Sequence, residues 1–191
     1  MHMIVVTCSP MRDVGRLGFP QFIGALIAAF VLLAAPAAAQ TARPWAHEAS
    51  DIAPDPSVRF GNLPNGMRYA LMHNALPAEA VSLRLSVAFG SLYETEAERG
   101  LAHFIEHMAF NGSTHVPEGE MVKILERLGL AFGADTNAST GQFFTTYQLD
   151  LPKASDDLLD ESLLLLRETA SELTFDASAI DRERGVVLSE W

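Results

Sequence analysis

Large apolar residues alternate with small or polar ones through Val81-Ser82-Leu83-Arg84-Leu85-Ser86-Val87-Ala88-Phe89. Successive side chains of a β-strand point to opposite faces of a sheet, so this pattern predicts a strand that is buried on one face. The apolar face needs a cover of other elements, whereas the polar face can meet water. The stretch therefore favours a sheet that is covered on one side.

The neighbouring segments predict the other strands of the sheet and the helices that cover its apolar face. Leu63-Pro64-Asn65-Gly66 predicts a turn, and a strand is expected at 67–73. Further along the chain we expect helices at 96–109 and between Pro117 and Gly129, strands at 132–138 and 143–151, a helix at 155–173, and a last helix with Asp176 as its N-cap. This order predicts an α+β fold, a largely antiparallel sheet with helices packed on one face.

The first of these helices carries the run His103-Phe104-Ile105-Glu106-His107. Residues four apart lie one above the other on a helix, roughly 5–6 Å apart at Cβ, so the two imidazoles could bind one metal ion. Glu106 flanks the pair and is the candidate general base for a water on that metal. The alternative is a helix whose histidines are hydrogen-bonded or solvated, but three constrained positions match the metal pattern.

A catalytic zinc site needs a third protein ligand. In the last helix Ile180, Glu183, Val187 and Glu190 recur at spacings of three and four, which places two carboxylates on one apolar stripe. Burial of a carboxylate beside Ile and Val is costly unless a cation or a hydrogen-bond network compensates it. Alternatively, Glu183 pairs with Arg182 or Arg184, and Glu190 is exposed near a frayed end.

Two blocks resemble the inverzincin peptidases of family M16, the pitrilysin, insulin-degrading enzyme and mitochondrial processing peptidase group. They are Gly100-Leu101-Ala102-His103-Phe104-Ile105-Glu106-His107-Met108-Ala109-Phe110-Asn111-Gly112 and Glu183-Arg184-Gly185-Val186-Val187-Leu188-Ser189-Glu190-Trp191. The second block looks like the periplasmic PqqL-like zinc proteases. The spacing from His107 to Glu190 is somewhat longer than in the best-known members, a difference that a loop insertion would explain.

This resemblance implies a role for each matching residue. His103, His107 and Glu190 would bind one Zn²⁺ ion, and Glu106 would be the base that activates a zinc-bound water. Glu183 would be the second acidic residue, assisting catalysis without binding the metal directly. Asn137-Ala138-Ser139-Thr140 resembles the edge strand to which an extended substrate adds by main-chain hydrogen bonds, so Asn137 and Ala138 are expected at the substrate site. An ordinary polar strand end is the alternative.

The first 39 residues predict a secretory signal peptide. Arg12 and Arg16 precede an apolar run from Phe22 to Leu33, and Ala37-Ala38-Ala39 provides a cleavage site. A membrane anchor is the alternative, but the run is short for a span of about 20 residues. We therefore expect a leader at 1–39, an N-terminal arm at 40–57, a domain at 58–191, a periplasmic or secreted location, and no stable membrane anchor.

Charge and cysteine content limit the binding partners and the cellular compartments that are expected for this chain. The formal net charge is -11, which makes nucleic acid an unexpected partner. The single cysteine, Cys8, lies in the predicted leader, which suits an oxidising compartment. His47, His73 and His115 lack metal-ligand spacing and are expected to be exposed or singly satisfied. Phe143 and Phe144, with Tyr147, are expected in the core.

These observations predict a zinc-dependent metalloendopeptidase that acts on peptides or unfolded proteins. The resemblance also implies further domains on the C-terminal side, in the same chain or in another, because its members continue past the last ligand. The alternatives are a non-catalytic binding or structural subunit of the same fold, an inactive truncated fragment, and a membrane-tethered protein with an incidental histidine pair.

Overall fold

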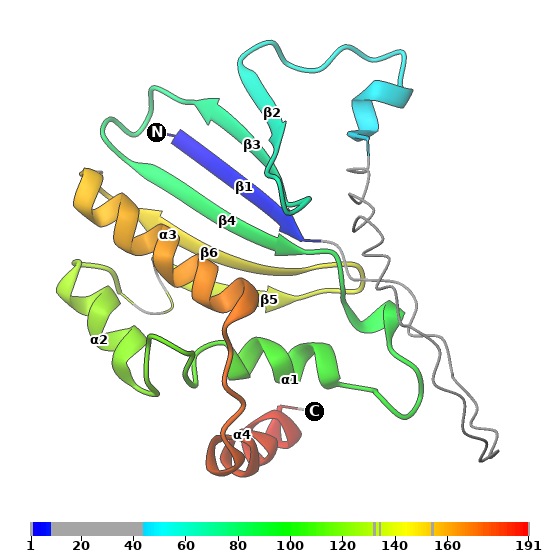
Figure 1. Cartoon of the computed structure of the whole chain (residues 1–191), viewed down its shortest axis with the longest axis vertical. Helices are drawn as coiled ribbons and strands as arrows, with labels where there is room; N and C mark the ends of the chain where they lie inside the picture. Colours follow the sequence, from blue (N-terminus) through cyan, green and yellow to red (C-terminus); the bar gives the residue numbers. More distant parts are fainter. Residues whose placement is uncertain (1, 9–43, 132, 134, 154, 191) are drawn as a thin grey trace, which may run out of the picture.

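A computed structural model describes residues 2–8, 44–131, 133, 135–153 and 155–190. Within them a six-stranded sheet has the order β2-β3-β1-β4-β6-β5, and helices cover one face of it (Figure 1). Every neighbouring pair is antiparallel except β1 with β4, which is parallel. The predicted α+β class with a largely antiparallel sheet is confirmed.

The sheet is built from six short strands. Their bounds are β1 His2–Cys8, β2 Val58–Asn62, β3 Arg68–His73, β4 Val81–Val87, β5 Thr136–Thr140 and β6 Thr145–Leu151. The strands β1 and β2 were not predicted from the sequence, and β5 begins four residues later than predicted. The run Ile4-Val5-Val6-Thr7 is β-branched and was the signal for β1, because such residues favour strands.

The helices follow the predicted order. They are α1 Leu101–Met108, α2 Glu120–Arg127, α3 Asp156–Ser171 and α4 Ala177–Ser189, with short 3₁₀ turns η1 Ala46–Ala49 and η2 Ser91–Tyr93. Ser155 caps α3 through its side chain, and Asp176 caps α4 as expected. Gly129 follows Leu128, the C-cap of α2, and has a φ of +78°, which explains the predicted stop.

The core lies between the sheet and α2 and α3. Leu83 and Leu85 of β4 and Leu149 of β6 point to this side, against Leu125 of α2 and Leu165 of α3. The opposite face of the same strands is polar, and there Arg84 forms two hydrogen bonds with Asp150. The alternation expected from residues 81–89 therefore separates core from surface in β4.

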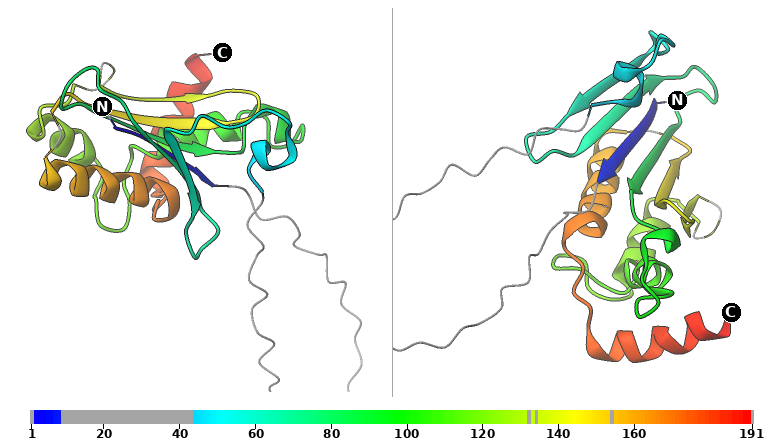
Figure 2. Two further views of the ribbon diagram at one scale, coloured as in Figure 1. Left: turned by 90° about the horizontal axis from the view of Figure 1, so that it is seen from above. Right: turned by 90° about the vertical axis from the view of Figure 1, so that its right-hand side faces the viewer.

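α4 lies apart from this core. It is on the far side of α1 from the sheet in Figure 1 and in the right-hand view of Figure 2. Only Ala179 and Val187 are buried among its described residues. α4 is therefore positioned by α1 rather than by the sheet.

The N-terminal segment contributes a second small cluster. Trp45 and His47 of the predicted arm contact Phe60 of β2, with ring centroids 4.8 and 4.5 Å from it, and Arg68 lies over Trp45. Residues 2–8 of the predicted leader form β1 of the sheet, whereas the rest of the leader, including the proposed cleavage site after Ala39, lies outside the described residues. In the described part of the chain, every helix is too short or too polar to cross a membrane.

Candidate metal centre

Helix α1 begins later than the sequence suggested, at Leu101 instead of residue 96. Gly100 has a φ of +87°, and the Glu94 carboxylate accepts hydrogen bonds from the backbone N–H groups of Gly100 (2.8 Å) and Ala102 (2.7 Å). These bonds satisfy donors that the first turn of a helix leaves unpaired. Glu94 therefore fixes the start of the helix just ahead of His103.

The two histidines of α1 face one another on the same side of the helix. Their ring centroids are 4.8 Å apart, the rings are nearly perpendicular at 82°, and the two Nε2 atoms are 3.2 Å apart. Both side chains are partly exposed. The two imidazoles therefore lie side by side on the helix, as predicted, and their Nε2 atoms are the two nitrogens available to one metal ion.

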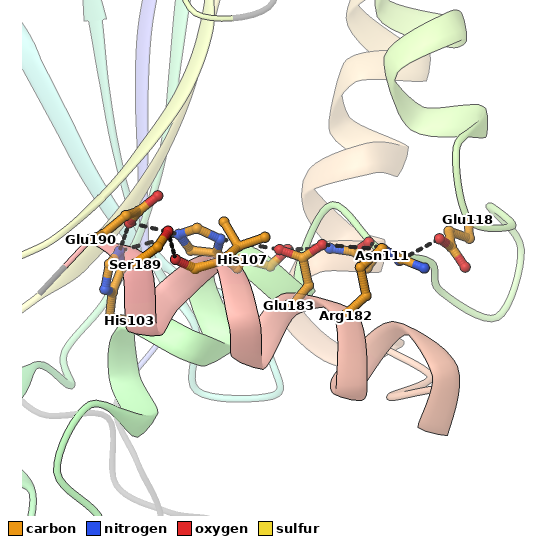
Figure 3. A network of polar contacts seen from close by, with 9 residues as sticks. His103, His107, Asn111, Glu118, Arg182, Glu183, Ser189 and Glu190 are labelled. Carbon is orange, nitrogen blue, oxygen red and sulfur yellow. Dashed lines mark hydrogen bonds and ion pairs between the residues drawn. The ribbon is translucent and has the colours of Figure 1, made fainter.

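Glu190 completes a triangle with these nitrogens. Its Oε2 atom lies 3.3 Å from Nε2 of His103 and 3.5 Å from Nε2 of His107 (Figure 3). Glu190 is the C-cap of α4, and 46% of its side chain is exposed. Although it lies at a helix end, as one alternative expected, its carboxylate is directed at both rings.

The triangle has the dimensions of a zinc coordination sphere. Ligand atoms about 2.0–2.1 Å from Zn²⁺ in a tetrahedral arrangement lie roughly 3.3 Å from one another. The three observed separations range from 3.2 to 3.5 Å. Two imidazoles and one carboxylate also form a common ligand set of catalytic zinc sites, so the residues present fit the ion.

Glu183 contacts the second ring nitrogen of His107, Nδ1, which does not face His103. Its Oε2 lies 3.3 Å from Nδ1 of His107, and its side chain is only 14% exposed. A carboxylate at Nδ1 holds the proton on that nitrogen, which leaves the Nε2 lone pair for a metal. Glu183 also lies 3.6 Å from Nε of Arg182, so the ion pair that the sequence offered as an alternative is present as well.

Glu106 is directed to another part of the site, toward the edge strand β5. It accepts a hydrogen bond from the Thr140 hydroxyl, which is also 3.4 Å from the Thr145 hydroxyl. Burial, with a smaller contribution from the nearby Glu106 charge, raises the pKa of the Tyr147 phenol far above its usual value. Tyr147 therefore stays neutral beneath the site.

A cleft of about 590 Å³ opens beside these groups. Its walls include His103 and Glu106 of α1 and the segment Ala138–Thr140 of β5. Asn137 is exposed on the same strand, and its Oδ1 accepts a hydrogen bond from the Ala138 backbone N–H (2.9 Å). Because β5 is the last strand of the sheet, the structure brings the predicted substrate strand to the edge of the cleft.

Other sequence expectations had mixed outcomes. His115 is 58% exposed and pairs with one residue, Glu168, as anticipated. Phe143 and Phe144 were expected in the core with Tyr147, but they are 48% and 51% exposed, whereas Tyr147 is buried. This prediction was wrong because both phenylalanines fall in the turn between β5 and β6, where side chains extend beyond the covered face.

Three parts of the site were not predicted from the sequence. Glu94 lies too far from His103 in the chain to be read as a helix cap, and Thr140 carries no motif beyond the polar strand end. Arg182 was considered only as a partner of Glu183, yet it also contacts Asn111 and Glu118. Each of these contacts joins residues that are not close neighbours in the chain, so no local sequence pattern indicates it.

Comparison with known proteins identifies the family of this chain. The model of the family described as Insulinase (Peptidase family M16) matches residues 69–191, nearly two thirds of the chain. Together with the sheet and the histidine pair, this match defines the class of protein. The chain belongs to peptidase family M16.

Within this family the chain is similar to proteins named PqqL. It is 39% identical over 137 residues to the Probable zinc protease PqqL of Haemophilus influenzae and to that of Escherichia coli. The crystal structure of the first half of the periplasmic protease PqqL from Escherichia coli superposes with a TM-score of 0.70 at 39% identity, covering 72% of this chain and 29% of that one. The chain spans 15% of the length of the two PqqL sequences and matches them over 72% of its own.

Proposed function

We propose that this chain carries the metal-binding domain of a zinc-dependent endopeptidase that cleaves peptides or unfolded proteins. The observation that carries the proposal is the triangle of two imidazole nitrogens and one carboxylate oxygen, 3.2 to 3.5 Å apart. The names of the relatives, zinc proteases of family M16, support it. Residues 58–191 would form this domain.

The residues of the chain divide the chemistry among them. A zinc ion held by His103, His107 and Glu190 would polarise a water molecule and the carbonyl of the peptide bond. Glu106 would accept the proton of the attacking water and later donate it to the leaving amine, while the Thr140 hydroxyl orients the carboxylate. Glu183 would keep His107 in the tautomer whose Nε2 is free.

Substrate would bind along the free edge of β5. An extended peptide can pair with an edge strand through main-chain hydrogen bonds. At Ala138 the backbone N–H now donates to the Asn137 side chain, so a substrate carbonyl would replace this acceptor. The position of Ala138 in the wall of the cleft that also contains His103 and Glu106 supports this assignment.

We also propose the wider context of the enzyme. A leader at 1–39, of which residues 2–8 form β1, would direct the domain to the periplasm or the exterior, and its cleavage would remove this strand from between β3 and β4. Residues 40–57 would form an arm on the surface of the domain. The similar Escherichia coli protein is described as periplasmic, which supports this location. Because the PqqL sequences are several times longer, we propose that further domains, in the same chain or in a second one, take part in cleavage.

The test combines metal content with hydrolysis of an unfolded protein by the full chain, alone and with an added C-terminal half. The Glu106→Gln variant should keep its zinc and lose activity by about 100-fold or more, the usual contribution of a general base. His107→Ala and Glu190→Ala should lose the metal as well. Unchanged turnover in Glu106→Gln would refute the mechanism, and zinc binding without any cleavage would indicate a binding subunit.

A further inference from the structure

The contacts between α4 and α1 follow a regular order along both helices. Arg182, Glu183 and Glu190 of α4 meet Asn111, His107 and His103 in turn, so the two helices run antiparallel (Figure 3). Two of these contacts involve the carboxylates already assigned to the metal site. The first, made by Arg182, lies outside it.

The guanidinium of Arg182 joins three separate segments. Its Nη2 atom donates to Oδ1 of Asn111 (2.9 Å), just after α1, and to Oε1 of Glu118 (2.5 Å), just before α2. Its Nε atom lies 3.6 Å from Oε1 of Glu183 within α4. An isolated exposed ion pair contributes little, but a planar guanidinium that donates to acceptors on two other segments fixes the position of α4 relative to both.

Asn111 connects this anchor directly to a metal ligand. Its Nδ2 atom donates to the backbone carbonyl of His107 (2.9 Å), while its Oδ1 accepts from Arg182. On the other side, Glu183 links Arg182 to Nδ1 of the same histidine. Arg182 therefore reaches His107 by two routes, one through the backbone and one through the imidazole.

Apolar packing alone positions α4 weakly. Ala179 and Val187 are its buried residues in the described part of the chain, whereas Val186 and Leu188 are 40% and 68% exposed. Yet Glu190 must stay within a few tenths of an ångström of its place for three donor atoms to bind one ion. A polar anchor at Arg182, about two turns before Glu190, supplies the constraint that the apolar contacts do not.

We infer that Arg182, with Asn111 and Glu118, is a positioning residue that fixes α4 against α1 in the register at which Glu183 and Glu190 meet the histidines. This inference rests on the proposed zinc site but assigns no step of the reaction to Arg182. Its direct consequence is on metal affinity.

The test measures the zinc affinity of the full chain by competition with a chromophoric chelator, using zinc alone as the probe. Arg182→Gln should bind zinc about tenfold more weakly, the lower end of the usual effect of groups that orient metal ligands. Arg184→Gln is the matched control, because it removes the same charge from the same helix and Arg184 pairs with Asp181 of that helix. It should change affinity by less than about twofold.

Further variants separate positioning from loss of structure. If Arg182 and Glu118 act as one anchor, the double variant Arg182→Gln/Glu118→Gln should bind zinc little more weakly than Arg182→Gln alone. Arg182→Lys, which keeps the charge but not the planar fork, should fall between Arg182→Gln and the parent. The visible absorption of the Co²⁺-substituted protein should shift in Arg182→Gln and not in Arg184→Gln.

The outcomes distinguish this inference from the proposed function. If the parent chain binds zinc and Arg182→Gln binds it equally well, the positioning role is refuted and the proposed site stands. If the parent binds no zinc, the proposed function fails first. Should Arg182→Gln unfold, the result for Asn111→Ala decides: equal zinc affinity to the parent contradicts the anchor, and weaker affinity with unchanged thermal stability supports it.

Discussion

Helices α3 and α4 follow one another in the chain, yet they are held in different ways. α3 lies on the sheet and buries Leu165 and Leu166 in the main core. α4 lies beyond α1, and its principal partners are the polar groups around His103 and His107 (Figure 2). The comparison shows that the scaffold depends on apolar burial, whereas the metal centre depends on a few polar contacts that bring one helix to another.

This difference predicts that stability and metal affinity can be changed separately. Substitutions in the sheet or α3 should lower the free energy of unfolding and leave zinc affinity nearly unchanged. Substitutions in the polar contacts of α4 should weaken zinc binding and leave the free energy of unfolding nearly unchanged. The following four experiments test this separation.

The largest effect is expected from Leu83→Ala in β4. Leu83 is fully buried, and truncation of such a residue costs about 2–5 kcal/mol in unfolding free energy. Urea denaturation of the zinc-free protein measures the loss. The control is Leu188→Ala, because Leu188 is 68% exposed on α4. Equal losses in both variants would contradict the division between scaffold and site.

Glu183→Ala should have the next largest effect, and on metal affinity. Without the carboxylate at Nδ1, His107 is free to change tautomer and orientation, which should weaken zinc binding about 10–100-fold. Chelator competition measures this affinity. The unfolding free energy of the zinc-free chain should change by about 1 kcal/mol, the usual net contribution of a side-chain hydrogen bond. A stability loss as large as that of Leu83→Ala would contradict the separation between the scaffold and the metal site.

Glu168 should give α3 a pH-dependent contribution to stability. Burial acts to raise the pKa of this fully buried carboxylate, but hydrogen bonds from the Ser113 hydroxyl and from the backbone and ring of His115 bring it below its usual value of 4.5. A lowered folded-state pKa adds stability above about pH 4.5, and this stability is lost as the pH falls through the folded-state value.

The measurement is the unfolding free energy between pH 3 and about pH 7, for the parent and Glu168→Gln. The parent should exceed the variant by about 1–3 kcal/mol at neutral pH, because the variant leaves buried donors poorly paired. The difference should shrink as the pH falls below the usual glutamate range. A difference that grows on acidification would show that the sign is wrong.

The smallest effect is expected on the polar face of the sheet. Arg84 and Asp150 form a two-bond ion pair at 2.8 and 3.1 Å, with side chains 25% and 39% exposed. Arg84→Gln should lower the unfolding free energy by less than about 1 kcal/mol, because solvent screens such pairs. A loss of the size found for Leu83→Ala would show that this face, too, is part of the scaffold.

The fold could be predicted from the sequence wherever local pattern and tertiary burial agree. Alternation at 81–89 and helical periodicity in α2, α3 and α4 gave these elements nearly their observed bounds. The start of α1 could not be predicted, because it depends on a carboxylate from Glu94 reaching Gly100 and Ala102 across a turn. β1 was missed because residues 2–8 were assigned to the predicted leader, although their β-branched run favours a strand.

The candidate site shows the same limit. His103 and His107 were paired by helical spacing alone, since four residues bring two side chains together on one helix. Glu190 was assigned through family resemblance, because its distance from the histidines depends on how α4 packs. Arg182, Asn111 and Thr140 act through contacts between elements, and no sequence spacing indicates these contacts.

The most direct test is a crystal of the full chain grown with zinc, with anomalous diffraction recorded at the zinc absorption edge. One peak should lie about 2.0–2.1 Å from Nε2 of His103, from Nε2 of His107 and from a carboxylate oxygen of Glu190. A peak coordinated elsewhere, or a Glu190 side chain directed away from an occupied histidine pair, would contradict the proposed metal centre.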